Sequence, residues 1–378
     1  MLKAILIDLV PPNVTKEEAD YRLDEAESLV RTFGGVVLIK RIQKKIEPNY
    51  KTYIGGGKVD EIKKEALECG ANILIVNNEL RPMQTYNLGE MLRDVKMEVW
   101  DRLDLILKIF QKHASTREAK LEIELASIRH MGPRIYGMGM QLTRQGGGIG
   151  TRGAGETNLE TMKRHLSKHE DRILEELEDC KRVRKLHREG RRRKNLKTVG
   201  IIGYTNAGKS SLLNALTHKG AYAADKLFAT LDTRVGKLYF EKSFDDGRVE
   251  RKEVLVSDTI GFIQDLAATL IKSFQSTLEE TIEADLLVHV IDLNDPKMED
   301  KMKVVHDILE KIKVADKPMI YVFNKLDLLA ARHTKKEIEK KCKELAKKYK
   351  AFKPCFVSTV TMVGIPEIKK QIEGMIGG

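Results

Sequence analysis

The chain has 378 residues, 42% hydrophobic and 33% charged, which is enough for two or three domains that each bury a core. Its formal net charge of +11 favours a polyanionic partner. It has no run of eighteen apolar residues, and its first apolar run contains Asp8, so we expect neither a membrane span nor a signal peptide. The four cysteines form no C-x-x-C pair, which argues against a cysteine metal site and indicates a reducing, cytoplasmic setting.

Residues 1–100 are predicted to form a small parallel α/β domain, because strand-like apolar runs alternate with amphipathic helical ones. The expected strands are "KAILIDL", "VVLIKRI", "NILIVNN" and "KMEVW". A glycine cluster, "YIGGGKVDEI" at 53–62, opens a helix but lacks the G-K-[ST] ending of a phosphate loop. We interpret it as a strand-to-helix turn, with a ligand-binding role as the alternative.

Residues 101–196 lose the strand pattern and are predicted to form two long helices. Apolar residues recur at intervals of three, four or seven in two stripes, namely Leu103, Leu107, Phe110, Ala114, Leu121, Leu125, Ile128 and Ile135, then Leu159, Met162, Leu166, His169, Ile173, Leu177, Cys180, Val183 and Leu186. Such narrow stripes favour pairing of the two helices as a long antiparallel hairpin.

The predicted tip of this hairpin, 144–156, reads "RQGGGIGTRGAGE" and matches G-x-G-x-x-G. No buried strand precedes it, so the pattern does not indicate a dinucleotide site. The tip is either a plain connecting loop or an RNA-facing one, in which Arg144 and Arg152 supply charge and glycines let backbone N–H groups approach phosphates. The basic run 181–197 is likewise a solvated face or an RNA contact.

Residues 197–378 return to the α/β pattern and open with a phosphate-binding motif. The strand "TVGIIGY" leads into "GYTNAGKS" and then into the helix "KSSLLNALT", as a P-loop requires. We expect Lys209 to contact the β- and γ-phosphates and Ser210 to bind Mg²⁺. The expected nucleotide contacts in this loop are Gly203, Tyr204, Thr205, Asn206, Ala207, Gly208, Lys209, Ser210 and Ser211.

Three later motifs follow in the order expected of a GTPase. "SDTIG" offers Asp258 to Mg²⁺ through a water molecule, and the Gly261 N–H to the γ-phosphate. "NKLD" offers Asp327 as a bidentate acceptor for the N1–H and 2-amino donors of guanine, which adenine lacks. The expected base contacts are Asn324, Lys325, Asp327, Ser358 and Thr359. These motifs together predict binding of GTP and GDP with Mg²⁺.

Some catalytic details stay open in the sequence. Thr230 and Thr233 are both candidates for a mobile threonine that completes Mg²⁺ coordination, and we favour Thr230. Phe262 follows the D-x-x-G motif, where Ras-like enzymes carry a water-orienting glutamine, so we expect slow intrinsic hydrolysis. Gln264 lies nearby without a proven role. Asn206 is a candidate ligand for a monovalent cation such as K⁺, or it only braces the loop.

The order of these motifs resembles the HflX family of translation-factor-related GTPases. The residues that carry the resemblance are "RQGGGIGTRGAGE", "GYTNAGKS", "LFATLD", "DTIGFIQDL", "STLEE", "NKLD" and "TREAKLEIELA". The resemblance implies a GTPase that binds the large ribosomal subunit and rRNA, is stimulated by the ribosome, and is associated with ribosome splitting or rescue. The chain departs from the family pattern at Ala154 and Ala267, where proline is usual, and at Thr359, where alanine is usual.

We therefore expect an α/β protein with three parts: an N-terminal domain at 1–100, a helical hairpin at 101–196 and a Ras-like P-loop GTPase domain at 197–378. Lys209, Thr230 and Gly261 are the expected catalytic residues, and Ser210, Thr230 and Asp258 the Mg²⁺ ligands. The expected partner is the ribosome, with the protein a monomer in solution. A GTP-regulated RNA-modifying or RNA-binding assembly factor is the alternative, and a scaffold that merely holds GDP is a third reading.

Overall fold

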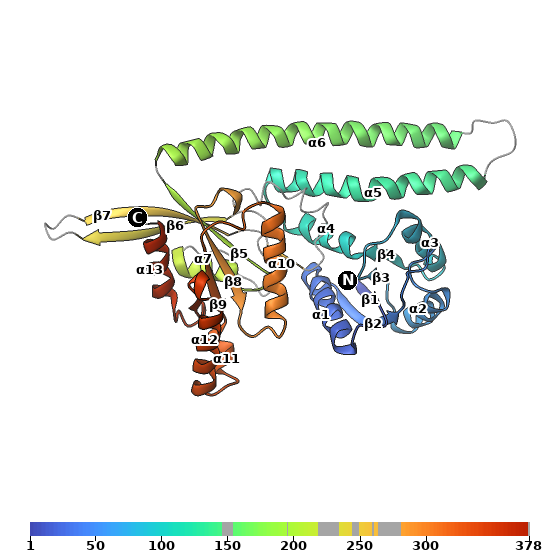
Figure 1. Ribbon diagram of the computed structural model, residues 1–378. Coiled ribbons are helices and arrows are strands. Elements are labelled where there is room, and N and C mark those ends of the chain that lie inside the picture. The colour runs from blue at the N-terminus through green and yellow to red at the C-terminus, as the bar shows by residue number, and fades with distance from the viewer. Residues whose placement is uncertain are drawn as a thin grey trace. The chain divides into compact units, whose positions relative to one another are not determined.

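The computed structural model describes residues 1–145, 154–194, 196–217, 234–243, 249–258, 261–263 and 281–376 (Figure 1). Its contacts group into two compact units, Met1–Lys112 with Lys120–Glu178, and His113–Ala119 with Asp179–Gly378. This grouping shares the helical region between both units, whereas the sequence predicted a separate hairpin domain; the three-part division remains a prediction. Within the described ranges, no helix is long and apolar enough to cross a membrane.

The first unit contains the predicted parallel sheet, with strand order β2-β1-β3-β4. Its strands are β1 (Lys3–Val10), β2 (Val36–Lys44), β3 (Ile73–Val76) and β4 (Glu98–Asp101). Its connecting helices are α1 (Lys16–Phe33), α2 (Gly56–Cys69) and α3 (Pro82–Leu92), and the glycine cluster forms the turn into α2. This is the parallel α/β domain that the alternating pattern predicted.

Strand β1 shows why both faces of this sheet are covered. Ile5 and Ile7 pack in one core with residues of α2 and α3. The alternate side chains point to the opposite face, because successive residues of a strand do so. There the fully buried Asp8 accepts a 2.8 Å hydrogen bond from Nε of Arg22 on α1. Helix α1 begins after Thr15, whose hydroxyl accepts from the Glu18 N–H, and ends at Gly34 in the left-handed conformation.

The helical region holds three helices, α4 (Arg102–His113), α5 (Arg117–Gln145) and α6 (Ala154–Arg193). The prediction of one continuous helix across 101–135 was therefore wrong. The "AST" segment interrupts it, and the hydroxyl of Thr116 accepts a hydrogen bond from the Ala119 N–H at 3.2 Å, which caps a new helix. Residues such as Leu103, Leu107 and Phe110 belong to α4 and are buried in the first unit.

Helices α5 and α6 run antiparallel, as the two stripes predicted (Figure 1). Ion pairs join Glu118 to Arg184 and Arg129 to Glu170, so residue numbers rise along α5 while those of their partners fall along α6. Ile173 is buried in the first unit.

The second stripe is exposed near both of its ends. Met162 is 44% exposed, Val183 is 53% exposed and Leu186 is 68% exposed, contrary to the prediction. The ion pair between Glu118 and Arg184 lies at the first turn of α5, so Leu186 extends past the start of its partner helix.

The second unit contains a six-stranded sheet of order β10-β9-β8-β5-β7-β6, parallel except for the antiparallel edge strand β6. The strands are β5 (Lys197–Gly203), β6 (Arg234–Ser243), β7 (Val249–Asp258), β8 (Leu286–Asp292), β9 (Met319–Asn324) and β10 (Cys355–Phe356). The helices are α7 (Lys209–Thr217), α10 (Met298–Lys311), α11 (Leu326–Ala330), α12 (Lys335–Lys348) and α13 (Ile365–Ile376), with a 3-10 turn at Lys350–Phe352.

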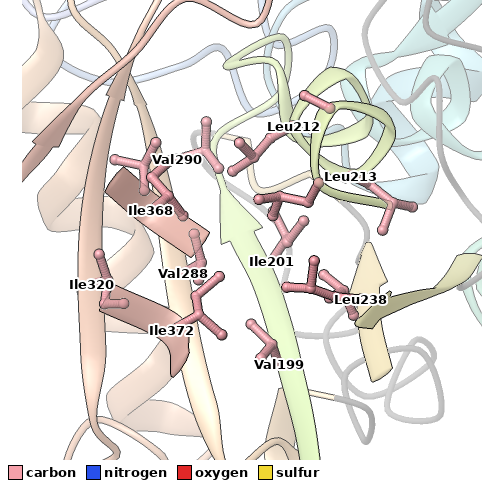
Figure 2. Packing of buried hydrophobic residues seen from close by; sticks show 14 of the residues in the cluster. Val199, Ile201, Leu212, Leu213, Leu238, Val288, Val290, Ile320, Ile368 and Ile372 are labelled. Carbon is pink, nitrogen blue, oxygen red and sulfur yellow. The ribbon is translucent and has the colours of Figure 1, made fainter. Parts of the chain in front are cut away.

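Helices α7 and α13 cover one face of this sheet and form its main core (Figure 2). Aliphatic side chains from β5 and β8, such as Ile201 and Val288, meet Leu212 of α7 and Ile368 of α13. Each fully buried side chain of this kind stabilises the fold by about 1.5–3 kcal/mol. The core fixes α7 against β5, and so fixes the loop between them.

Candidate guanine-nucleotide site

The phosphate loop runs from the end of β5 at Gly203 to the start of α7 at Lys209. Gly208 has a φ of 96°, and a side chain there would collide with Nδ2 of Asn324. A side chain at Gly203 would collide with the carbonyl of Val290 on β8. Asn206 also has a left-handed φ, of 61°, and is exposed. The loop therefore needs glycine at positions 203 and 208, because any side chain there would prevent this backbone conformation.

Lys209 is a buried cation at the start of α7. Its Nζ donates a 2.9 Å hydrogen bond to the carbonyl of Tyr204. Burial lowers the pKa of Lys209 to about 8, and the nearby carboxylate of Asp258 only partly opposes that shift. A buried ammonium group at a helix N-terminus suits a polyphosphate, whose negative charge would favour its protonated form.

Ser210 and Asp258 bring two oxygen ligands together. Strand β7 lies parallel to β5 with Ile201 opposite Asp258, which places the Asp258 carboxylate at the carboxyl edge of the sheet. The Ser210 hydroxyl donates a 2.6 Å hydrogen bond to Oδ2 of Asp258. A hydroxyl and a buried carboxylate at this distance fit the oxygen preference of Mg²⁺. The assignment of these two residues as metal ligands remains a prediction.

Gly261 and Phe262 are attached directly to the phosphate loop. The Phe262 N–H donates to the Gly203 carbonyl at 3.1 Å, and the Thr205 N–H donates to the Phe262 carbonyl at 2.8 Å. The Phe262 side chain is fully buried. A side chain at Gly261 would lie 2.9 Å from Nζ of Lys209. Gly261 therefore borders the lysine that we expect at the γ-phosphate, and Phe262 faces the core instead.

Thr205 offers a further indication of a ligand. Its side chain is buried, and its hydroxyl has no hydrogen-bond partner among the described residues. A buried hydroxyl without a partner is costly, and a bound ligand relieves that cost.

The predicted base-binding residues meet at the carboxyl ends of β9 and β10. Asn324 donates from Nδ2 to the Ala207 carbonyl at 3.0 Å, which joins the base loop to the phosphate loop. Its Oδ1 accepts from the Thr359 N–H at 3.3 Å. The Ser358 hydroxyl donates to Oδ1 of Asp327 at 2.6 Å, and this holds the carboxylate in one orientation. These contacts fit a pocket that reads guanine through Asp327.

Several predicted residues fall outside the part of the chain that the structure describes. They are Thr230, Thr233, Gln264, Ala267 and the glycine-rich tip between 146 and 153. Ser211 lies in α7 and is partly buried.

The sequence reasoning missed two groups of polar residues. One is Asp292 and Asn294, which contact Lys325. Their position after a buried strand could have revealed them, since ligand sites gather at the carboxyl ends of parallel strands. The other group, in the first unit, joins α4 to α5: Arg134 binds Asp101 and Asp104, and His130 lies 3.3 Å from both carboxylates. No sequence motif indicated that group.

A strand-loop-helix phosphate motif with a nearby Mg²⁺-type pair and a base loop defines a P-loop GTPase. Three family models match the chain in sequence order: "GTP-binding GTPase N-terminal" over 20–111, "GTP-binding GTPase Middle Region" over 113–191, and "50S ribosome-binding GTPase" over 198–325. The chain belongs to the HflX family of GTPases. It binds guanine nucleotide and hydrolyses GTP, as the predicted enzyme class required.

Curated relatives named GTPase HflX cover most of the chain. The protein from Caldanaerobacter subterraneus subsp. tengcongensis is 43% identical over 327 residues, 86% of this chain and 73% of the relative. The Escherichia coli K12 protein is 38% identical over 81% of this chain and 70% of its own length. The Thermococcus kodakarensis protein is 36% identical over 81% and 66%, respectively.

The fold is shared with a solved structure, a GTP-binding protein from Sulfolobus solfataricus in complex with GDP. The TM-score is 0.51 at 23% identity, with coverage of 100% of this chain and 99% of that chain. At this identity the likeness concerns the fold alone.

Proposed function

We propose that this GTPase binds the large ribosomal subunit under control of its nucleotide, in a cytoplasmic, monomeric form. The single observation that carries the proposal is the basic end of α6 and its ion pair to the GTPase fold. The run 181–194 carries most of the positive charge of α6, and Arg188 on it lies 3.3 Å from the Glu283 carboxylate. The family model over 198–325 is described as a 50S ribosome-binding GTPase, which supports the same partner.

The nucleotide is held by the residues that the motifs predicted. Backbone N–H groups of the phosphate loop surround the α- and β-phosphates, and Lys209 contacts the β- and γ-phosphates. Ser210, Asp258 and Thr230 would hold Mg²⁺, which would neutralise charge on the phosphate oxygens. Asp327 accepts from guanine, while Ser358 keeps its carboxylate in place.

Hydrolysis is the attack of a water on the γ-phosphorus, with the bond to the β-γ bridging oxygen breaking. Lys209 and the Gly261 N–H stabilise the charge that develops on the γ-phosphate oxygens. Phe262 can neither donate to the water nor accept from it, and its ring lies in the core. Intrinsic turnover is therefore slow, and the ribosome supplies the stimulation. Asn206, exposed at the loop, is the residue that would bind a K⁺ ion.

The hairpin is connected to the nucleotide site through residues 281–285. Glu283 contacts Arg188 of α6, and the Asp285 carboxylate accepts from the Thr198 N–H at 2.8 Å at the start of β5. A side chain at Gly200 of the same strand would lie 3.1 Å from Cβ of Ala284, so this segment lies close against β5. This segment follows the D-x-x-G motif in the chain. A conformational change in that motif on GTP binding would therefore alter the contact between Glu283 and Arg188 of α6.

Cosedimentation with purified large subunits tests the proposal, comparing a non-hydrolysable GTP analogue with GDP. We expect binding with the GTP analogue alone. Equal binding in both states, or no binding in either, would contradict the proposed control of ribosome binding by the nucleotide. Replacing the exposed Lys185 and Arg193 of α6 with glutamate should weaken binding and flatten its salt dependence. The matched control replaces Lys340 and Lys343, exposed on α12, in the same way.

A further inference from the structure

The loop after β8, Asp292–Asp295, carries polar side chains that none of the GTPase motifs includes. We infer that Asp292 and Asn294 are positioning residues for the guanine base, acting through Lys325. The inference rests on the proposed base pocket and concerns what holds that pocket in shape.

Both ends of Lys325 are held by this loop. Nδ2 of Asn294 donates a 2.8 Å hydrogen bond to the Lys325 carbonyl. Nζ of Lys325 lies 2.8 Å from Oδ2 of Asp292. The Asn294 N–H in turn donates to Oδ1 of Asp292 at 3.0 Å, so the two supporting residues also fix each other.

Lys325 needs such support because of its backbone. Its φ is 67°, a left-handed conformation that a residue with a side chain seldom adopts. Lys325 lies between Asn324, bonded to the phosphate loop, and Asp327, bonded to Ser358. The backbone conformation of Lys325 therefore sets the direction of the Asp327 carboxylate relative to Asn324. Only in this conformation can Asp327 face the base while Asn324 stays bonded to Ala207.

The ammonium group of Lys325 has a separate requirement. A guanine ring can pack on the apolar stem of a lysine while the charged end stays solvated or paired. Asp292 supplies the counter-charge that holds the Lys325 ammonium group away from the position of the base. Loss of the Asp292 charge would leave the Lys325 side chain free to move. The conformational entropy that this side chain loses when the nucleotide binds would then be larger, which weakens binding.

The same loop extends to the phosphate end of the site. Asp295 forms a 2.5 Å ion pair with Lys301 of α10, and Nζ of Lys301 lies 4.6 Å from the ring centroid of Tyr204 in the phosphate loop. Lys325 and Tyr204, which these contacts reach, are not among the residues that we expect at the γ-phosphate. We therefore expect changes in nucleotide affinity and not in the rate of the chemical step.

Two nearly isosteric variants test this. Asp292→Asn removes the charge, and Asn294→Asp removes the donor to the Lys325 carbonyl. Each should raise the Kd for GDP and the KM for GTP about tenfold with kcat unchanged, and Asp292→Glu should recover part of the loss. The matched control is Asn87→Asp, which removes an amide-to-carbonyl bond of 2.8 Å, to Lys51, in the first unit. It should leave both constants unchanged.

A double-mutant cycle separates this inference from the base pocket itself. Lys325→Ala alone should raise the Kd for GDP, and adding Asp292→Asn should then have no further effect. If Lys325→Ala leaves the Kd unchanged, the pocket assignment is wrong and the inference falls with it. If Lys325→Ala weakens binding but Asp292→Asn and Asn294→Asp do not, the pocket stands and the positioning role is overturned. Full additivity on the Lys325→Ala background overturns it as well.

Discussion

The Ser210 hydroxyl donates to the Asp258 carboxylate across 2.6 Å, although 48 residues separate the two in the chain. This contact joins the first turn of α7 to the end of β7. When Mg²⁺ is bound, Ser210 and Asp258 would hold it there, Ser210 through its hydroxyl and Asp258 through water. The relationship makes the metal dependence of both residues testable.

Ser210→Ala and Asp258→Asn should each lower kcat for GTP by about 100-fold or more, because Ser210 would bind the charge-neutralising Mg²⁺ through its hydroxyl and Asp258 would hold it through water. Phosphate release measured across a Mg²⁺ titration checks this. The half-saturating Mg²⁺ concentration should rise in both variants. Wild-type Mg²⁺ dependence in either one would contradict the assignment of that residue.

Asp327→Asn should lower GTP affinity about 100-fold, because the variant loses a charged acceptor for two guanine donors. An amide at this position can donate to the C2 carbonyl of xanthine, so affinity for XTP should rise in the same variant. Competition of both nucleotides against fluorescent GDP measures the change. An unaltered preference for GTP over XTP would rule out Asp327 as the base-reading residue.

Gly208→Ala should abolish nucleotide binding and destabilise the GTPase fold by about 1–3 kcal/mol, because φ is 96° there and the new methyl group meets Asn324. The matched control is Gly190→Ala in α6, where a side chain meets nothing within 4 Å. That change should raise stability by about 0.5–1 kcal/mol. Equal effects of the two substitutions, measured by denaturant unfolding and GDP binding, would contradict the steric argument.

Phe262→Gln should not accelerate GTP hydrolysis, although glutamine is the residue that Ras-like enzymes use. The Phe262 ring is fully buried and its backbone is bonded to Gly203 and Thr205, so a glutamine would enter the core. Burying an unpaired amide should lower stability by about 1–3 kcal/mol. Single-turnover hydrolysis and thermal unfolding test this together, and a large rise in rate would show that the side chain reaches the water.

His130 should give the first unit a stability that is lost in alkali. Burial opposes its charge, but the carboxylates of Asp101 and Asp104 outweigh burial and raise the pKa of His130 to about 9. A raised pKa means that the stabilisation, about 3 kcal/mol, is fully present below pH 6.5 and disappears as pH rises through about 9.

His130→Gln should remove that pH dependence. The difference in unfolding free energy between the wild type and the variant should shrink between pH 7 and 10, as followed by calorimetry. Glutamine keeps a polar side chain at the site but cannot carry the positive charge. Parallel curves over this pH range would show that His130 is not protonated in the folded protein.

The phosphate and base motifs could be predicted from sequence because each is a short string whose chemistry is local. Gly208 is required by a backbone angle, and Ser210, Asp258 and Asp327 each follow or adjoin a buried strand. Parallel strands bring their carboxyl ends to one edge, so residues in separate strings were expected to meet, and Ser210 does meet Asp258. The alternation of strands and helices similarly predicted the fold class.

Other features were not predicted from the local pattern. The apolar stripe at 103–135 has the period of one helix, although Thr116 caps α5 locally and α5 is separate from α4. Val183 and Leu186 keep the helical period but are exposed, and Leu186 extends past the start of α5. The burial of Phe262 and the ion pair between Asp292 and Lys325 likewise follow from the order of the strands in the sheet. The sequence by itself determined which residues offer groups suited to phosphate, metal and guanine, because those groups belong to the side chains and the local backbone. The tertiary structure decided which neighbours orient them, because burial and pairing exist only once distant strands are packed together.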